Sequence, residues 1–397
     1  MRFVIFISLA LGIVGGTHYY FWLRLVRDTS LPPALRLLAT ILIVLLAVSL
    51  PASFFLLRAL SLHAARAVLF PVYVWMGIML LLLTALAGTD LLRVLGTLIA
   101  RLAGASVDPA RRLLLARWQA GLALGAVALA TIFSVRAAMG GARVRRVEVT
   151  LPGLPAALDG TKLAQLTDLH LGATLGKRWL EGVVARVNEL EPDLVAITGD
   201  LVDERVPKLR DTVSAVRALR ARHGVFFVTG NHEYYSGARE WMEELPRHGL
   251  RVLRNERVQV GRDGVSFELA GIDDHSARGM APGHGPDLSR ALAGVAPGRP
   301  IVLLAHQPKA VLEAQRHGVG LVLSGHTHGG QIWPWRYFVY LQQPVVAGLR
   351  RYGETQVYVS DGTGFWGPPM RLGTRSEITL ITLRAPAQPG GAAAHIR

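Results

Sequence analysis

The stretch KLAQLTDLHLG (residues 162–172) sets a short apolar run directly before Asp168 and His170. Side chains able to bind metals recur after four more short runs, in TGDLVDE (198–204), TGNHE (229–233), LAHQP (304–308) and SGHTHGGQ (324–331). Short apolar runs are typical of buried strands, and ligands of α/β proteins gather at the carboxyl ends of strands. We therefore expect these five pieces to meet on loops at one edge of a sheet.

Around these pieces, apolar runs alternate with stretches of helical spacing. Arg178–Leu190 and Lys208–Arg222 have that spacing. Strand–helix alternation predicts an α/β domain with a sheet covered on both faces. The expected strands are Lys162–Thr167, Leu194–Thr198, Val225–Thr229, Val265–Ala270, Ile301–Ala305, Leu321–Ser324, Gln356–Ser360 and Ile378–Leu383.

The composition changes sharply along the chain of 397 residues. Residues 1–142 hold 12 Lys/Arg and 3 Asp/Glu, whereas residues 143–397 hold 31 and 25. We expect a membrane domain over 1–142, a catalytic domain over 143–384 and a disordered tail over 385–397. Most of the basic excess flanks apolar segments, which favours anionic lipid over nucleic acid as partner. The chain has no cysteine, so disulfides and thiolate chemistry are excluded.

The first domain contains four apolar stretches, each long enough to cross a hydrocarbon core of about 30 Å. None carries a charge near its centre, and arginines flank them. The first could alternatively be a signal peptide, but its run is long and has no obvious cleavage site. The four stretches are about Phe3–Leu23, Leu35–Leu57, Ala67–Ala87 and Leu115–Met139.

Between the third and fourth stretches, polar residues recur every three to four positions from Asp90 to Arg101. This pattern predicts either a short amphipathic helix at the membrane interface or a helical extension packed on the bundle. The basic residues on the two sides are nearly balanced, so they leave the orientation in a cell membrane undecided. The first stretch alone favours a catalytic domain outside the cytoplasm.

The ligand types indicate the metal chemistry. Aspartate, asparagine and histidine suit Mn, Fe, Zn or Mg better than Cu(I), which prefers sulfur. Asp168 and His170, two residues apart on an extended segment, can hold one ion. His326 and His328 have the same spacing, but a glycine-rich turn could direct them to two ions. Asp200 follows a glycine that permits a sharp turn, so its carboxylate could bridge two metals.

The order of these motifs resembles the calcineurin-like metallophosphoesterase superfamily over roughly residues 160–383. GIDD (271–274) and SDGTGFWGPPMRLGTRSEITLITL (360–383) are similar to its bacterial membrane-associated phosphodiesterase branch, which is related to UDP-2,3-diacylglucosamine hydrolases. The resemblance implies a four-layer α/β/β/α sandwich, here preceded by a bundle of four transmembrane helices. It also implies two divalent ions, one held by Asp168, His170, Asp200 and His328, the other by Asp200, Asn231, His306 and His326.

These features predict a membrane-anchored phosphoesterase that cleaves a phosphodiester or pyrophosphate bond with water activated between two ions. The resemblance also implies that His232 lies beside the phosphate and not on a metal, where it would protonate or stabilise the leaving group. Asp203 and Glu233 would orient ligand histidines, or else be solvated loop carboxylates. The alternative function is a catalytically quiet membrane scaffold or sensor that keeps the fold.

The substrate is left open by the sequence, as are substrate-binding residues and the oligomeric state. A membrane anchor favours a lipid-linked or membrane-proximal phosphoester. Aromatic residues follow the last ligands, and they would contact lipid or else pack as core or as a dimer contact. They are Trp333, Trp335, Tyr337, Phe338 and Tyr340, after Ile332.

Overall fold

The computed structural model describes residues 2–104, 108–262 and 264–387. The chain divides into a helical unit, Met1–Met139 with Gly367–Leu372, and a globular unit, Gly140–Trp366 with Gly373–Arg397. The predicted disordered tail lies almost entirely outside the described residues.

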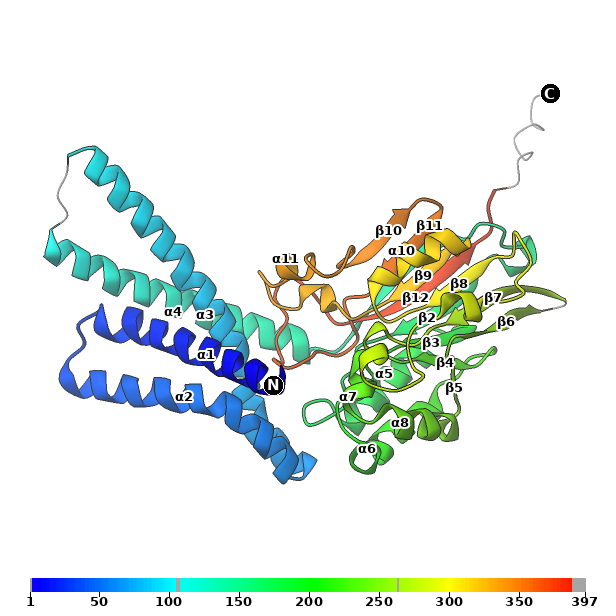
Figure 1. Cartoon of the computed structure of the whole chain (residues 1–397), viewed down its shortest axis with the longest axis horizontal. Helices are drawn as coiled ribbons and strands as arrows, with labels where there is room; N and C mark the ends of the chain where they lie inside the picture. Colours follow the sequence, from blue (N-terminus) through cyan, green and yellow to red (C-terminus); the bar gives the residue numbers. More distant parts are fainter. Residues whose placement is uncertain (1, 105–107, 263, 388–397) are drawn as a thin grey trace. The chain divides into compact units, whose positions relative to one another are not determined.

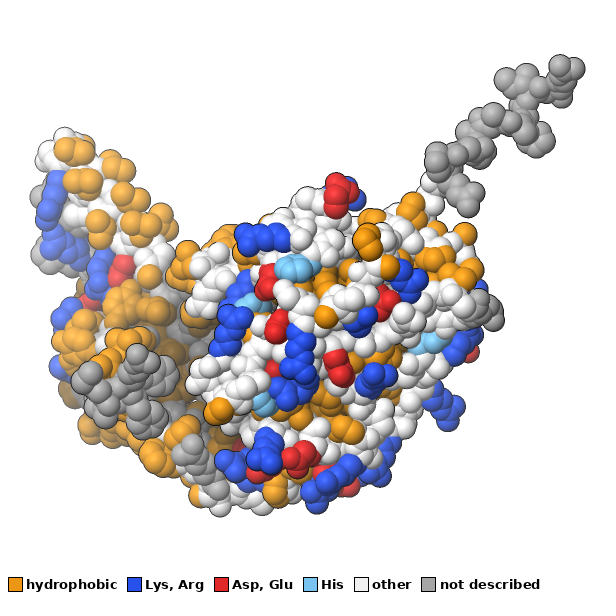
Figure 2. All heavy atoms as spheres, turned by 45° about the vertical axis from the view of Figure 1, so that its right-hand side comes forward, with side chains coloured by type: hydrophobic (Ala, Val, Ile, Leu, Met, Phe, Trp, Pro, Cys, Tyr) orange, Lys and Arg blue, Asp and Glu red, His pale blue; other side chains and the backbone are white. Residues whose placement is uncertain are grey.

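The helical unit contains four long helices, each packed against the next (Figure 1). They are α1 (Arg2–Trp22), α2 (Pro33–Ala59), α3 (Leu62–Leu102) and α4 (Pro109–Met139), with a π-helical turn at Leu23–Arg27 after α1. Hydrophobic side chains form large patches on the visible surface of this unit (Figure 2). On α2, for example, Leu37, Leu38 and Leu45 are more than 60% exposed, as expected of side chains that face lipid.

Among the described residues, three segments are long and apolar enough to cross a membrane: Pro33–Leu57, Leu62–Leu102 and Ala110–Met139. Three of the four expected spans are therefore supported, and the span over α1 stays a prediction. The segment from Asp90 to Arg101 continues α3 without a break, so it is a helical extension. The carboxylate of Asp90 accepts hydrogen bonds from Tyr20 and Arg24, which ties this extension to α1 and the turn that follows it.

Two six-stranded sheets form the centre of the globular unit (Figure 1). Sheet 1 has the order β1 (Arg143–Thr150), β12 (Glu377–Arg384), β2 (Thr161–Leu166), β3 (Leu194–Thr198), β4 (Val225–Val228), β5 (Leu250–Val252). Sheet 2 has the order β10 (Gly348–Tyr352), β11 (Thr355–Val359), β9 (Leu321–Ser324), β8 (Ile301–Leu304), β7 (Val265–Gly271), β6 (Glu256–Arg262).

The core lies between the two sheets. Leu163 and Leu194 of sheet 1 share one buried cluster with Phe267, Val302 and Leu321 of sheet 2, and all five are fully buried. Each such side chain contributes about 1.5–3 kcal/mol to folding. This packing holds the two sheets face to face and fixes the loops at their ends.

Helices cover the outer faces of both sheets. On the side of sheet 1 are α5 (Lys177–Asn188), α6 (Val206–Val213), α7 (Asn231–Tyr235) and α8 (Ala238–Glu244) (Figure 1). The smaller α9 (Leu288–Ala291) and α10 (Val311–Ala314) bury apolar side chains against sheet 2. The mixed α/β sheets agree with the expected fold class. All eight predicted strands are present, and β1, β5, β6 and β10 were not predicted.

Candidate metal centre

The seven predicted ligands lie on five loops. Those of Asp168, Asp200 and Asn231 follow β2, β3 and β4 of sheet 1, whereas those of His306 and the pair His326/His328 follow β8 and β9 of sheet 2. The expectation of one sheet edge is therefore corrected: two sheets supply the loops. Parallel pairing of neighbouring strands brings their carboxyl ends together within each sheet.

The backbone is unusual at these positions. Nine described non-glycine residues have a positive φ, and five of them are predicted ligands, with φ between 45° and 69°: Asp168, His170, Asp200, His326 and His328. Such left-handed conformations cost energy in residues with a Cβ and persist where the surroundings impose them. Their concentration here indicates that the loops are shaped for function.

Glycines allow the loops to approach closely. Gly199 has φ 91°, the sharp turn predicted before Asp200. Gly230 lies so close to Asp200 that a Cβ would collide with its carboxylate and backbone nitrogen. Any larger residue at Gly230 would push this carboxylate away from its partners.

The first group of ligand atoms consists of Asp168, His170 and His328. The His170 Nε2 lies 3.1 Å from the His328 Nε2, which lies 3.4 Å from a carboxylate oxygen of Asp168. The His170 Nδ1 donates to the carboxylate of Asp203 at 2.8 Å, so its Nε2 carries a lone pair. Lone pairs that face one another in a buried space repel unless a cation lies between them.

The second group has the same character. The His306 Nδ1 donates to the carbonyl oxygen of Thr198 at 2.8 Å, so the His306 Nε2 is an acceptor. That atom lies 3.1 Å from Asp200 Oδ2, 3.2 Å from Asn231 Oδ1 and 3.2 Å from His326 Nδ1. Oxygen and nitrogen acceptors thus converge on one point, which is the arrangement that a divalent cation requires.

Asp200 belongs to the second group and also lies close to His170 of the first. Its Oδ2 lies 3.1 Å from the His306 Nε2 and 3.8 Å from the His170 Nε2. Its Oδ1 accepts the backbone N–H of His232 at 2.9 Å, which fixes the orientation of the carboxylate. The donor set therefore fits divalent metal ions, with Asp200 close to ligand atoms of both groups.

Asp203 connects a predicted ligand to the predicted catalytic histidine. Its Oδ1 lies 2.8 Å from Nδ1 of both His170 and His232. Burial disfavours the charged form of His232, but Asp200 and Asp203 outweigh it and raise its pKa to about 9. Cations beside Asp200 would offset part of this negative charge and lower that pKa again. His232 also approaches the group formed by His170 and Asp200, so its atoms lie within reach of a metal.

Glu233 contacts backbone amides, whereas it was predicted to orient a histidine. Its carboxylate accepts the backbone N–H groups of Gly230 at 2.6 Å, Leu201 at 2.8 Å, Asp200 at 3.0 Å and Val202 at 3.3 Å. Burial, followed by the charge of Asp200, raises the pKa of Glu233 to about 7. Glu233 thereby joins the loop of Asp200 to the loop of Asn231.

Residues not predicted to act also lie at the site. The rings of Tyr235 and Trp366 lie 5.1 and 5.7 Å from the ring of His232, and both side chains are more than half exposed. The side-chain amide of Gln331 donates to the Trp366 carbonyl at 2.9 Å and accepts its N–H at 3.0 Å. In the sequence, Trp366 could have been noticed because it lies in the stretch 360–383 that resembles the family. Tyr235 could have been noticed only because it lies two residues after TGNHE (229–233).

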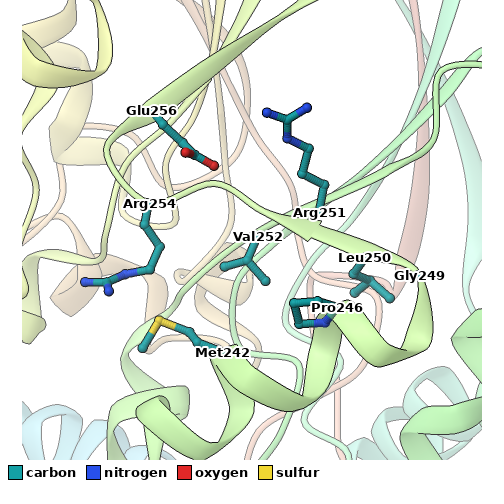
Figure 3. Close-up of a pocket in the computed structure, with 8 residues that line it drawn as sticks. All are labelled: Met242, Pro246, Gly249, Leu250, Arg251, Val252, Arg254 and Glu256. Atoms are coloured by element: carbon teal, nitrogen blue, oxygen red, sulfur yellow. The ribbon is translucent and has the colours of Figure 1, made fainter.

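The hollow in Figure 3 is a different feature. It runs along β5, the outer strand of sheet 1, and is lined by residues such as Met242, Pro246 and Arg251. Its lining contains none of the predicted ligands. The chemistry of this chain is therefore assigned to the convergent ligands at the strand ends.

Comparison with known proteins identifies the family. Residues 161–330 match the family described as "Calcineurin-like phosphoesterase". The "Transmembrane protein with metallophosphoesterase domain" of Danio rerio is 43% identical over 274 residues, 67% of this chain and 63% of that protein. The protein of the same name from Bos taurus is 42% identical over 296 residues, which are 68% of this chain and 67% of that protein. An "Uncharacterized metallophosphoesterase" of Aquifex aeolicus is 33% identical over 245 residues, 61% of this chain and 92% of that protein.

The chain thus spans only about two thirds of the length of the first two relatives. Their names and the three candidate spans support a membrane location for this chain. The strand ends, the convergent acceptors and these similarities lead to one conclusion: the chain belongs to the calcineurin-like metallophosphoesterase family.

Proposed function

We propose that this chain is a multi-pass membrane phosphoesterase that uses two divalent ions to hydrolyse a phosphodiester or pyrophosphate bond. The observation that carries the proposal is the set of acceptor atoms converging around Asp200. One ion would be held by Asp168, His170, Asp200 and His328, the other by Asp200, Asn231, His306 and His326. When bound, the ions would neutralise phosphate charge and lower the pKa of a water molecule.

The protein's own residues would complete the chemistry. Asp203 accepts from the His232 Nδ1, so the His232 Nε2 is directed elsewhere and can carry the proton that a leaving alkoxide needs. Tyr235 and Trp366 flank this ring and would confine the leaving group. Glu233 would keep Asp200 in place through the amides around it.

A lipid-linked or membrane-proximal substrate is supported by the exposed aromatic segment Trp333–Leu341. Trp333, Trp335 and Tyr337 are 49%, 50% and 61% exposed, and neighbouring Phe338 is 53% exposed, so this segment is not core. It lies directly against the turn that carries His328, because Gly330 touches the backbone of Arg336. Tryptophan and tyrosine are enriched at membrane interfaces.

The strand register gives independent support. In sheet 1, Arg143 at the start of β1 pairs with Glu377, and β12 pairs in turn with β2, which ends two residues before Asp168. β1 and β2 are separated by two strand spacings, which amount to about 10 Å. Met139 ends the last candidate span, and four residues of chain reach at most about 14 Å. The covalent chain alone therefore limits how far the ligands can lie from the membrane.

The test uses the full-length protein in detergent with Mn²⁺ and bis-p-nitrophenyl phosphate. Wild type should hydrolyse this diester and bind two metal ions per chain, measured by elemental analysis. Asp200→Ala should lose both properties, whereas Asp211→Ala should keep them, because the Asp211 side chain is 84% exposed and pairs with Lys177. Equal inactivity of wild type and Asp200→Ala across Mn, Fe, Zn and Mg would refute the enzymatic proposal and favour a quiet scaffold.

A further inference from the structure

A basic groove lies between the edge strand β1 and helix α5, within the globular unit. Arg143 and Arg146 contribute from β1, and Arg178 and Arg186 contribute from α5. Its volume of about 750 Å³ falls in the range of ligand pockets, about 300–1,000 Å³. None of the lining residues is acidic, and none is a predicted metal ligand.

Three of these arginines have no counter-charge among the residues that the structure describes. Within the described part of the chain, no carboxylate lies within ion-pair distance of Arg143, Arg146 or Arg178, while Arg186 approaches the exposed Glu189 at 3.5 Å. In contrast, Arg145 between them pairs with Glu377 at 3.5 Å and does not line the groove. Guanidinium groups without partners attract anions, and their planar donors suit phosphate oxygens.

The floor of the groove is apolar. Val183 and Ile378 are buried, and Trp179 is partly buried beside them. Gly182 faces the same groove, and a Cβ there would have no atom within 4 Å, so the space above it is open. The groove therefore combines unpaired positive charge with hydrocarbon and aromatic surface. A ligand that joins a phosphate to an apolar body matches both parts.

The position of the groove along the chain favours a lipid as that ligand. Gly140, the first residue of its lining, directly follows Met139 at the end of the last candidate span. Arg143 comes three residues later, so the covalent chain keeps it within about 14 Å of that end whatever the orientation of the units. Anionic headgroups attract basic residues at this depth.

We propose that this groove binds the phosphate headgroup of an anionic phospholipid. The arginines hold the phosphate, and Trp179 and Val183 contact the glycerol and the first methylenes of the acyl chains. The proposal does not depend on catalysis, because the groove shares no residue with the metal centre. It predicts that the globular unit is held to the membrane by a lipid as well as by its spanning helices.

The experiment titrates delipidated full-length protein in a neutral detergent with short-chain phosphatidylglycerol or phosphatidylcholine, and counts bound lipid by native mass spectrometry. The test variant Arg146→Gln/Arg178→Gln removes one arginine from each wall. The control Arg239→Gln/Arg316→Gln removes the same charge from exposed positions elsewhere on the unit. Each basic residue near an anionic membrane surface strengthens binding about fivefold. The test variant lacks two arginines, so it should bind phosphatidylglycerol about 25-fold more weakly than wild type. Its melting temperature should stay unchanged.

The proposal is supported if only the test variant loses binding and phosphatidylcholine binds weakly to all three proteins. It is overturned if the control loses as much, because the effect then follows net charge. It is also overturned if wild type binds both lipids equally. A last measurement adds inorganic phosphate at a concentration equal to that of phosphatidylglycerol. If phosphate displaces the lipid, the groove binds free phosphate and the proposal of a lipid ligand is wrong.

Discussion

The substitution Glu233→Gln tests how the ligand loops are held together. One carboxylate oxygen of Glu233 accepts the N–H groups of Leu201 and Val202, and the other accepts those of Asp200 and Gly230. Glutamine keeps the size of the side chain but replaces one oxygen by an NH₂ group. Two buried N–H donors would then face another donor.

The structure sets the size of the effect. A buried donor left without an acceptor costs about 1–3 kcal/mol, so two such donors cost about 2–6 kcal/mol. For a domain of this size each kcal/mol lowers the melting temperature by about 2–4 °C. We therefore expect Glu233→Gln to lower it by roughly 10 °C. The loop of Asp200 should also shift, which weakens metal binding.

The assay compares wild type, Glu233→Gln and Glu240→Gln in the same detergent. Glu240 lies on α8 with its side chain 53% exposed and 3.9 Å from Arg205, so its substitution should change the melting temperature by less than about 2 °C. Melting is followed by tryptophan fluorescence, and metal content by elemental analysis. If Glu233→Gln melts within 2 °C of wild type and retains both ions, the proposed role of Glu233 is wrong.

Three further predictions concern the site. His232→Ala should lower the rate of diester hydrolysis at least 100-fold while two ions remain bound, and loss of an ion would make His232 a ligand. The double variant Trp333→Ala/Trp335→Ala should hydrolyse lipid diesters with less preference over soluble diesters than wild type does. Leu312 is an exposed residue of α10, and the control Leu312→Ala should leave this preference intact. An unchanged preference in the double variant would count against lipid contact. Chelation should lower the melting temperature by about 10 °C, since a site at 100-fold its Kd contributes about 2.7 kcal/mol. Asp200→Ala should show no such drop, and a drop of equal size would contradict the shared site.

The strands that carry ligands were predictable because they are short, apolar and buried along most or all of their length. β3 and β9 begin and end at the predicted residues. The missed strands have a different character: β1 reads RVRRVEVT and has a mostly exposed edge, and β5 has only three residues. Their apolar signal is weak because an edge strand buries little, so the sequence pattern could not separate them from loops.

The candidate ligands could be named from the sequence and stay a prediction, whereas only some of the contacts that position them could be foreseen: Asp203 was expected beside a histidine, but the backbone contacts of Glu233 were not. Spacing alone cannot tell that Glu233 binds four backbone amides, because three of those amides belong to a loop some 30 residues earlier. Nor could it place Tyr235 and Trp366 beside one histidine, since they are separated by most of the domain. Contacts of this kind depend on how the two sheets meet, which no local pattern encodes.

Asp203 shows how one such contact between loops bears on the proposed function. One oxygen, Oδ1, lies 2.8 Å from Nδ1 of His170 and 2.8 Å from Nδ1 of His232. A carboxylate can accept both N–H groups, and its pKa is held well below its usual range because the two histidines outweigh the cost of burial. It thus fixes the tautomer of a predicted ligand and of the predicted proton donor together. Movement of the loop after β3 would disturb both contacts at once, so the proposed metal binding and the proposed leaving-group chemistry would be coupled through Asp203.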